Sequence, residues 1–293
     1  MNNIQRGILH PIPKHARYLA FTLASDAEPR SSLQSLRDLA DGENTVVGIG
    51  QSLALALNCK IDGLHSFPVQ IGAGIEAPST PAALWCWLRG EDRGELLHRS
   101  RRIEQAIMDD FILDDVLDAF EYGATLDLTG YEDGTENPKD NDAVQAAIVQ
   151  GQGQGMDGSS YVAVQQWVHD LDLFDDMGTT EQDHTFGRRK KDNEEIEDAP
   201  ESAHVKRTAQ ESFSPQAFIL RRSMPWTGDM ESGLNFVAFG KSFDAYEALL
   251  HRMMGLEDGI SDALFTFTRP VTGYYFWCPP MKNGKLDLSL LGI

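Results

Sequence analysis

The chain has 293 residues, of which 41% are hydrophobic, and its 45 acidic against 25 basic side chains give a formal net charge of −20 at pH 7. This length can bury a substantial core as one large or two smaller domains, and this charge repels nucleic acid and anionic membranes, which excludes polyanion binding. The three cysteines, Cys59, Cys86 and Cys278, form neither a C-x-x-C pair nor a zinc-type cluster, so we expect no disulfides and a reducing, cytoplasmic location.

The first half of the sequence predicts alternating strands and helices. Its N-terminal segment does not resemble a secretory signal, because Pro11, Pro13 and Lys14 interrupt the apolar residues. No later segment contains the roughly 18 consecutive apolar residues that a membrane helix needs. Hydrophobic periodicity predicts strands at residues 16–24, 45–49 and 83–90, helices at 32–40, 51–58 and 93–109, and an acidic amphipathic segment at 113–122.

The second half repeats this plan. The pattern predicts strands at residues 159–171, 217–226 and 233–240, helices at 180–184 and 243–255, and a closing strand pair within 262–280, with its turn at 270–273. Polar residues 140–158 and charged residues 187–202 are expected to be solvated loops. We therefore predict an α+β protein with two halves, residues 1–129 and 130–293, each with antiparallel strands and helices on one side.

The motif GYEDGTENP, residues 130–138, is the strongest local signal for function. Asp-Gly pairs usually form turns, but Gly134 after Asp133 also allows the backbone to lie close to a ligand. The chain has no G-x-S-x-G, H-E-x-x-H or P-loop motif, so hydrolase and nucleotide chemistry lack a visible nucleophile or phosphate-binding loop. An enzyme with this sequence is expected to take its chemistry from a cofactor.

This motif resembles the GxxDG signature of the dye-decolourising peroxidases, in the form found in their compact cytoplasmic bacterial subgroup. Four further segments resemble the family in order and spacing, and the resemblance covers nearly the whole chain. These segments are HTFGRR, ESAHVKRT, ILRRSMPW and DALFTFTRPVTGYYFWCPP. The resemblance implies two ferredoxin-like domains with antiparallel sheets, with haem b held mainly by the C-terminal domain.

The resemblance also implies the residues of a haem site. His204 corresponds to the proximal iron ligand, Asp262 to the acid that orients its second ring nitrogen, and Arg188 to a residue that reaches a haem propionate. By residue statistics alone, Asp262 is equally well explained as a solvated acid, and aromatic pocket residues as core. The remaining pocket positions implied are Gly134, Thr135, Glu136, Arg221, Ser223, Phe236 and Phe265.

Peroxide chemistry suggests roles for Asp133 and Arg221. When the O–O bond breaks, one oxygen loses a proton and the other gains it, so a carboxylate can carry the proton and a guanidinium can stabilise the departing negative charge. Arg221 and Ser223 lie two apart on a predicted strand, so both should face the pocket, while Arg222 and Met224 should face away.

We predict a cytoplasmic haem b peroxidase that reduces hydrogen peroxide and oxidises dyes, phenols or Mn(II) in one-electron steps. The alternative is a haem-handling protein that stores haem or releases its iron, since the same ligand and pocket would serve. His169, at the end of an apolar strand, is the rival iron ligand. Aromatic residues that either relay electrons or simply pack are Trp167, Trp226, Trp277, Tyr274 and Tyr275.

The C-terminal tail KLDLSLLGI, residues 285–293, is apolar, although chain termini are normally frayed and polar. Docking on the protein's own surface or in a homo-oligomer interface would shield these side chains from water. By resemblance, SLLGI is similar to the peptide that loads some peroxidases of this subgroup into an encapsulin shell, with Leu288, Leu290 and Ile293 as anchors. We expect a homo-oligomer that binds neither nucleic acid nor membrane.

Overall fold

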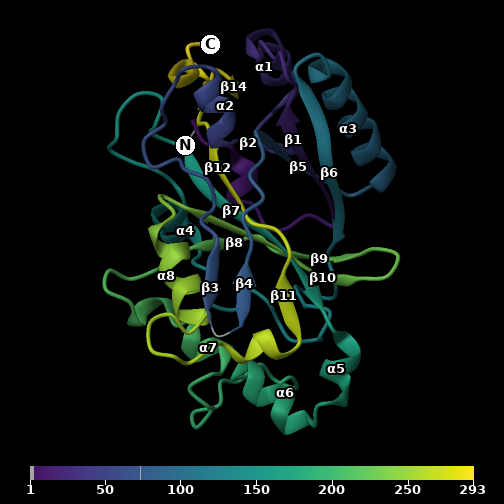
Figure 1. Cartoon of the computed structure of the whole chain (residues 1–293), viewed down its shortest axis with the longest axis vertical. Coiled ribbons are helices and arrows are strands. Elements are labelled where there is room, and N and C mark those ends of the chain that lie inside the picture. Colours follow the sequence, from purple (N-terminus) through teal and green to yellow (C-terminus); the bar gives the residue numbers. More distant parts are fainter. Residues whose placement is uncertain (1–2, 73) are drawn as a thin grey trace.

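One ten-stranded antiparallel sheet forms the centre of the protein (Figure 1). The computed structural model describes residues 3–72 and 74–293. The strands of this sheet are β1 (His15–Leu23), β2 (Thr45–Ile49), β5 (Leu84–Gly90), β6 (Phe111–Phe120), β7 (Ser160–His169), β8 (Leu220–Arg221), β9 (Met224–Thr227), β10 (Ser232–Gly240), β11 (Thr268–Pro270) and β12 (Tyr274–Cys278). Two hairpins stand apart, β3 (Gln70–Gly72) with β4 (Ile75–Ala77) and β13 (Met281–Lys282) with β14 (Lys285–Leu286).

Each half follows the β-α-β-β-α-β order of a ferredoxin-like fold. The first half has the strand order β2-β5-β1-β6 and the second β12-β7-β10-β9, so in both the fourth strand lies beside the first. The helices are α1 (Arg30–Leu39), α2 (Gln51–Ala56), α3 (Arg93–Ile107), α4 (Asp140–Ala147), α5 (Leu171–Asp176), α6 (Thr179–Phe186), α7 (His204–Arg207) and α8 (Asp244–Met253), with 3-10 turns η1 (Arg6–Ile8), η2 (Gln210–Ser212), η3 (Ala263–Thr266) and η4 (Ser289–Leu291). The predicted α+β class with two antiparallel halves is confirmed. The division after residue 129 falls between β6 and β7 and stays a prediction.

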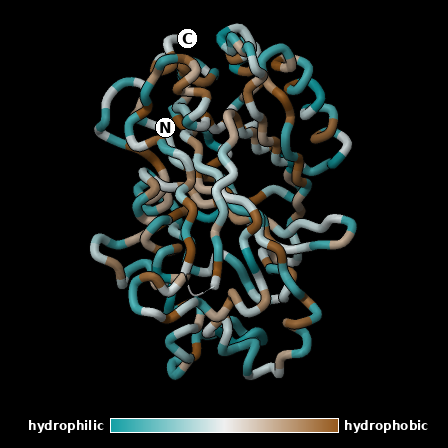
Figure 2. The backbone as a smooth tube through the Cα atoms, viewed as in Figure 1, coloured by the Kyte–Doolittle hydropathy of each residue, from teal (hydrophilic) through white to brown (hydrophobic). Residues whose placement is uncertain are grey.

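The four-stranded units of the two halves pair with each other at both edges, so the strands form a closed ring. Trp277 in β12 pairs with Ile49 in β2, and Ala119 in β6 pairs with Trp226 in β9. One apolar cluster fills the ring and includes Trp85 and Trp87, whereas a second cluster lies between the strands and helices α1, α2, α3 and α8. Strands β2, β5 and β12 are buried on both faces and are almost continuous apolar runs. Figure 2 shows hydrophobic residues interspersed with hydrophilic ones along the backbone. No helix among the described residues has the length and hydropathy needed to span a membrane.

The predicted closing strand pair within residues 262–280 is wrong. Its first part forms η3, and β11 and β12 pair one after the other with β7 instead of with each other. The predicted strand 217–226 is also interrupted, because Arg222 and Ser223 separate β8 from β9. Both segments carry enough apolar residues for strands, but tertiary pairing decides which residues join the ladder.

The expected solvated loop at residues 140–158 is only partly correct. Its first eight residues form α4, which buries Ala143, Ala146 and Ala147. Small alanines give a weak hydrophobic pattern among charged and amide side chains, so periodicity did not indicate this helix. The helix follows the GYEDGTENP loop and helps to hold its end against the sheet.

The C-terminal tail docks on the protein's own surface. Leu286, Leu288 and Leu291 are each at most 1% exposed and belong to the cluster beneath the helices. Arg30 in α1 donates a hydrogen bond of 2.9 Å to the carbonyl of Gly292. The tail is therefore an integral part of the packing around α1, near which the C-terminus lies in Figure 1.

Candidate active site

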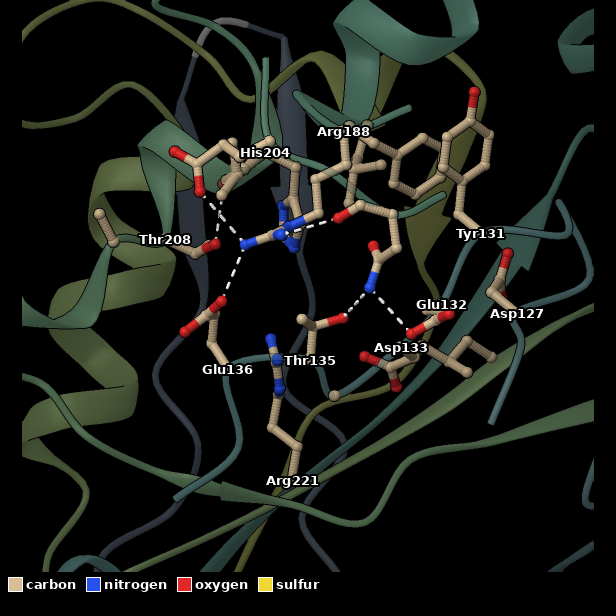
Figure 3. A pocket seen from close by; sticks show the side chains of 18 of the residues that line it. Asp127, Tyr131, Glu132, Asp133, Thr135, Glu136, Arg188, His204, Thr208 and Arg221 are labelled. Atoms are coloured by element: carbon tan, nitrogen blue, oxygen red, sulfur yellow. Dashed lines mark hydrogen bonds and ion pairs between the residues drawn. The ribbon is translucent and has the colours of Figure 1, made fainter. Parts of the chain in front are cut away.

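A cavity lies between the GYEDGTENP loop, α7 and strands β7, β8 and β10 (Figure 3). Its outer part, with a volume of about 230 Å³, has mainly polar side chains, whereas its inner part, about 100 Å³, is mostly apolar. The residues common to both parts are Asp133, His169, His204, Thr208, Gln210, Arg221, Leu234, Leu264 and Thr268. The three residues predicted from sequence to carry the chemistry, Asp133, His204 and Arg221, thus share one cavity.

His204 is the first residue of α7, and a buried carboxylate orients its imidazole ring. Its Nδ1 lies 2.7 Å from Oδ2 of Asp262, whose side chain is fully shielded from solvent. The other oxygen of Asp262 accepts the backbone N–H of Leu264 at the start of η3, so both carboxylate oxygens are fixed. Nε2 of His204 has no hydrogen-bond partner among the described residues. The ring therefore has one nitrogen available to a ligand in the cavity.

His169 also lines the cavity, but both of its ring nitrogens are occupied. Nδ1 lies 2.6 Å from Oγ1 of Thr268, and Nε2 lies 3.1 Å from Oδ1 of Asp127. Although burial raises the pKa of Asp127, hydrogen bonds from His169 and Thr129 more than offset this and hold the pKa below its ordinary value. His169 is therefore tied into a buried ion-pair geometry, and His204 is the better placed of the two as a metal ligand.

Asp133 and Arg221 project into the cavity from the loop and from β8, with His204 entering from the other side (Figure 3). Burial raises the pKa of the Asp133 carboxyl, the charge of Arg221 opposes this rise, and the nearby charge of Asp127 adds to it. The neighbouring Arg222 does not line this cavity, and its guanidinium donates to the carbonyls of Ile8, Leu9 and Arg221. The expectation that Arg221, rather than Arg222, serves the pocket thus agrees with the structure.

Ser223 lies outside the wall of the cavity. It is buried and lines an adjoining groove that reaches Asp133 and Arg221 from the other side of the loop. Its hydroxyl accepts a long hydrogen bond of 3.4 Å from the backbone N–H of Val237. The break between β8 and β9 ends the regular alternation that placed Ser223 beside Arg221.

Arg188 lies at the polar rim of the cavity. Its guanidinium donates to Glu136 at 2.8 Å, to Glu195 at 3.2 Å and to the carbonyl of Asn193 at 3.0 Å. The preceding Gly187 ends α6 with φ of +82°, and any side chain at this position would clash with α7. Because Gly187 packs against Val205 in α7, the adjacent Arg188 is held close to the helix that begins with His204. Gly134 and Thr135 line the same outer part of the cavity.

The inner part contains residues that no local motif indicated. Phe236 lines it as predicted, whereas Phe265 packs on Trp167 with ring centroids 5.4 Å apart and is not part of the wall. Gln165 and Trp167 in β7 line it too, and their buried side-chain N–H groups have no hydrogen-bond partner within residues 3–72 and 74–293. Alternation along β7 could suggest which residues share a face, but not that this face borders a cavity.

These residues fit a haem group. The donor set is an imidazole with one free nitrogen, backed by a carboxylate, as haem iron commonly requires. An apolar inner cavity suits the porphyrin ring, and the arginine at the rim suits its anionic propionates. The unpaired N–H groups of Gln165 and Trp167 indicate that this cavity holds a group that the protein alone does not supply.

The comparisons with known proteins agree with this interpretation. Residues 124–283 match the family model described as Dyp-type peroxidase, C-terminal. The chain is 30% identical to the dye-decolorizing peroxidase of Rhodococcus erythropolis, over 94% of this chain and 86% of that protein, and 29% identical to that of Mycobacterium tuberculosis, over 93% and 87%. It is similar to the structure of a Dyp-type peroxidase protein from Shewanella oneidensis, with a TM-score of 0.90 and 28% identity over 99% of this chain and 98% of that chain. A haem-bound DypB variant from Rhodococcus jostii RHA1 gives a TM-score of 0.84 and 26% identity over 93% and 94%. The chain therefore belongs to the Dyp-type peroxidase family of haem-dependent enzymes.

Proposed function

We propose that this peroxidase holds haem b through His204 and acts on hydrogen peroxide with Asp133 and Arg221. The observation that carries this proposal is the shared cavity: a half-buried carboxylate and a guanidinium face the same space as an imidazole with a free Nε2. The imidazole would hold the haem iron, and Asp133 and Arg221 would act on peroxide in the same cavity.

His204 would supply the bond to iron, and Asp262 would keep the proton on Nδ1 and increase the basicity of the ring. Arg188 would bind a propionate, next to Gly134, Thr135 and Glu136 at the rim. The inner cavity with Phe236 would exclude water from the ring. When bound, haem supplies the redox chemistry that protein side chains lack.

Asp133 would accept a proton from one peroxide oxygen and return it to the other, while Arg221 stabilises the negative charge that develops as the O–O bond breaks. Burial raises the pKa of Asp133 and so makes the carboxylate a stronger base, and the charge of Arg221 opposes this rise. Ser223 lines the adjoining groove, which Asp133 and Arg221 also border.

We further propose dyes, phenols and Mn(II) as one-electron donors. A DypB variant from Rhodococcus jostii RHA1 has been solved in complex with manganese, which supports Mn(II) among them. Haem handling without turnover remains the rival function. An absorption spectrum separates the two: a Soret band that shifts on peroxide addition and returns with a donor supports the peroxidase, whereas a band that only bleaches contradicts it.

A cytoplasmic location, a homo-oligomer and loading into an encapsulin shell stay predictions. The buried leucines of the docked tail favour a structural role, because a loading peptide would have to leave its place on the core. Fusing residues 285–293 to a fluorescent protein tests loading without disturbing the enzyme. Co-purification of this fusion with a shell protein would support encapsulation, and its absence would leave the structural role.

A further inference from the structure

The side-chain amide of Asn137 binds both backbone polar groups of Arg221. Its Nδ2 donates to the Arg221 carbonyl at 3.1 Å, and its Oδ1 accepts the Arg221 N–H at 2.8 Å. Arg221 pairs with Ala238 of β10 on one side of β8. The amide of Asn137 therefore occupies the free edge of β8, where the next strand of a sheet would bind.

The same asparagine closes the turn that follows Asp133. Its backbone N–H donates to the carbonyl of Gly134 at 3.0 Å. Gly134 has φ of +82°, and a Cβ atom there would lie 2.8 Å from Nδ2 of Asn137. Glycine is thus required both for the backbone conformation and for the space that the amide occupies. The glycine next to the acid in the GYEDGTENP motif makes this contact between loop and strand possible.

We propose that Asn137 is a positioning residue that fixes the carboxylate of Asp133 relative to the guanidinium of Arg221. The inference rests on the proposed roles of Asp133 and Arg221. The loop carries the acid and the strand carries the guanidinium, and the two hydrogen bonds of Asn137 join these elements at Arg221 itself. Catalysis depends on this connection between loop and strand, because a displacement of a catalytic group by about 1 Å can cost on the order of 100-fold in rate.

The connection that Asn137 makes between loop and strand also affects the pH dependence of activity. The charged groups that face the Asp133 carboxyl are Arg221 from β8, Asp127 from the chain before the loop, and His204 from α7. Burial raises the pKa of Asp133, and Arg221 opposes the rise. If Arg221 moves away, the pKa rises further, so the loss of activity at acid pH should begin at a higher pH. Reduced stability alone would lower the melting temperature but would not move this acid limb.

The test uses Asn137→Ala in the haem-loaded full chain. The spectral change after peroxide addition should be about 10- to 100-fold slower than in the parent, and its acid limb should move to higher pH. The Soret band should remain, because His204 and Asp262 are untouched. Independently of activity, hydrogen exchange of the Arg221 amide should accelerate in the haem-free protein, because its acceptor is lost.

The matched control is Asn193→Ala. Asn193 also binds the loop, through Glu132 and Thr135 at 2.8 Å each, but it makes no hydrogen bond to Arg221. This variant should keep the parent acid limb and the slow exchange of the Arg221 amide. An equal shift of the acid limb in both asparagine variants would mean that general loosening of the loop is responsible, and would overturn the proposal.

A second variant keeps the test decisive if Asn137→Ala does not bind haem. Asn137→Asp retains an acceptor for the Arg221 N–H and loses the donor to its carbonyl, so it should slow the reaction and move the acid limb in the same direction. A parent rate and acid limb in either haem-bound variant would overturn the inference. If Asp133→Asn and Arg221→Leu also react with peroxide at the parent rate, the proposed function fails as well. If those two variants react slowly but the Asn137 variant reacts at the parent rate, only the positioning role is rejected.

Discussion

The Nδ1 atom of His204 lies 2.7 Å from Oδ2 of Asp262, and the side chain of that aspartate has no exposed surface. A carboxylate in this position fixes the orientation and tautomer of a ligand imidazole and raises its basicity. The pair is held by two different elements, α7 and the start of η3. The orientation of the ring therefore depends on a tertiary contact across 58 residues of sequence.

Asp262→Asn should weaken haem binding, because an amide is a poorer acceptor for the Nδ1 proton. Loss of such a partner typically costs about 10- to 100-fold in metal affinity or activity. Transfer of haem to an excess of a haem-acceptor protein measures the change. Asp175→Asn, at an exposed position of α5, is the control and should release haem at the parent rate.

His204→Ala should lose haem or hold it weakly, because Nε2 of His204 would form the only strong bond between the protein and the iron. His169→Ala should keep the Soret band, although it leaves Asp127 short of a partner and should lower stability by about 1 to 3 kcal/mol. Titration of each variant with haem, followed at the Soret band, checks both. Loss of haem from the His169 variant alone would reverse the assignment.

Asp133→Asn and Arg221→Leu should each bind haem but respond slowly to peroxide. Removal of one group that transfers a proton or stabilises charge typically costs about 10²- to 10⁴-fold. Stopped-flow absorption after peroxide addition measures the rate. Arg269→Leu is a charge-matched comparison, because the largely exposed Arg269 side chain pairs with Glu231 and does not line the cavity. A parent rate in either cavity variant removes that residue from the mechanism.

Asp133→Asn should also make the haem-free protein more stable at neutral pH. Burial raises the folded-state pKa of this carboxyl above its ordinary value, so the folded state binds its proton more tightly than the unfolded state does. Ionisation above the folded pKa therefore costs stability, and this cost disappears as the pH falls through it. Melting temperatures at pH 7 and near pH 4 should show that the amide variant is more stable than the parent and that this advantage shrinks at the lower pH. A less stable variant at pH 7 contradicts the prediction.

Deletion of residues 286–293 should prevent stable folding. The deletion removes three leucines that are at most 1% exposed, and each such side chain contributes about 2 to 5 kcal/mol, against a total stability of about 5 to 15 kcal/mol for a typical domain. Thermal unfolding and the yield of soluble protein measure the effect. Leu55→Ala, whose side chain is 62% exposed in α2, should change little. A truncated chain with the parent melting temperature would show that the docked tail is dispensable.

Strands β2, β5 and β12 could be predicted from the sequence because both of their faces are buried. The run Thr45–Ile49 is buried from end to end, and β2 has the predicted bounds. The failures lie where tertiary pairing decides. Nothing local in DALFTFTRPVTGYYFWCPP shows that β11 and β12 both bind β7, or that Phe265 belongs to a 3-10 turn.

The site was predicted through motifs and not through periodicity. GYEDGTENP indicated Asp133, but the role of Asn137 in the same string depends on the backbone of Arg221, which is 84 residues away. Without the family resemblance, the sequence could not rank His169 against His204, since a histidine's hydrogen bonds are tertiary contacts. The structure ranks them by showing two occupied nitrogens on His169 and one on His204.

The closed ring of strands makes the two halves dependent on each other. Strands of the two halves pair at two places, and each pairing consists of a single residue pair, Trp277 with Ile49 and Ala119 with Trp226. A fragment with one half alone would expose two open strand edges and the large apolar side chains that fill the ring, and such edges promote aggregation. Duplicated architecture therefore does not imply two autonomous modules: the polypeptide should melt in one cooperative transition, and residues 130–293 expressed alone should be insoluble.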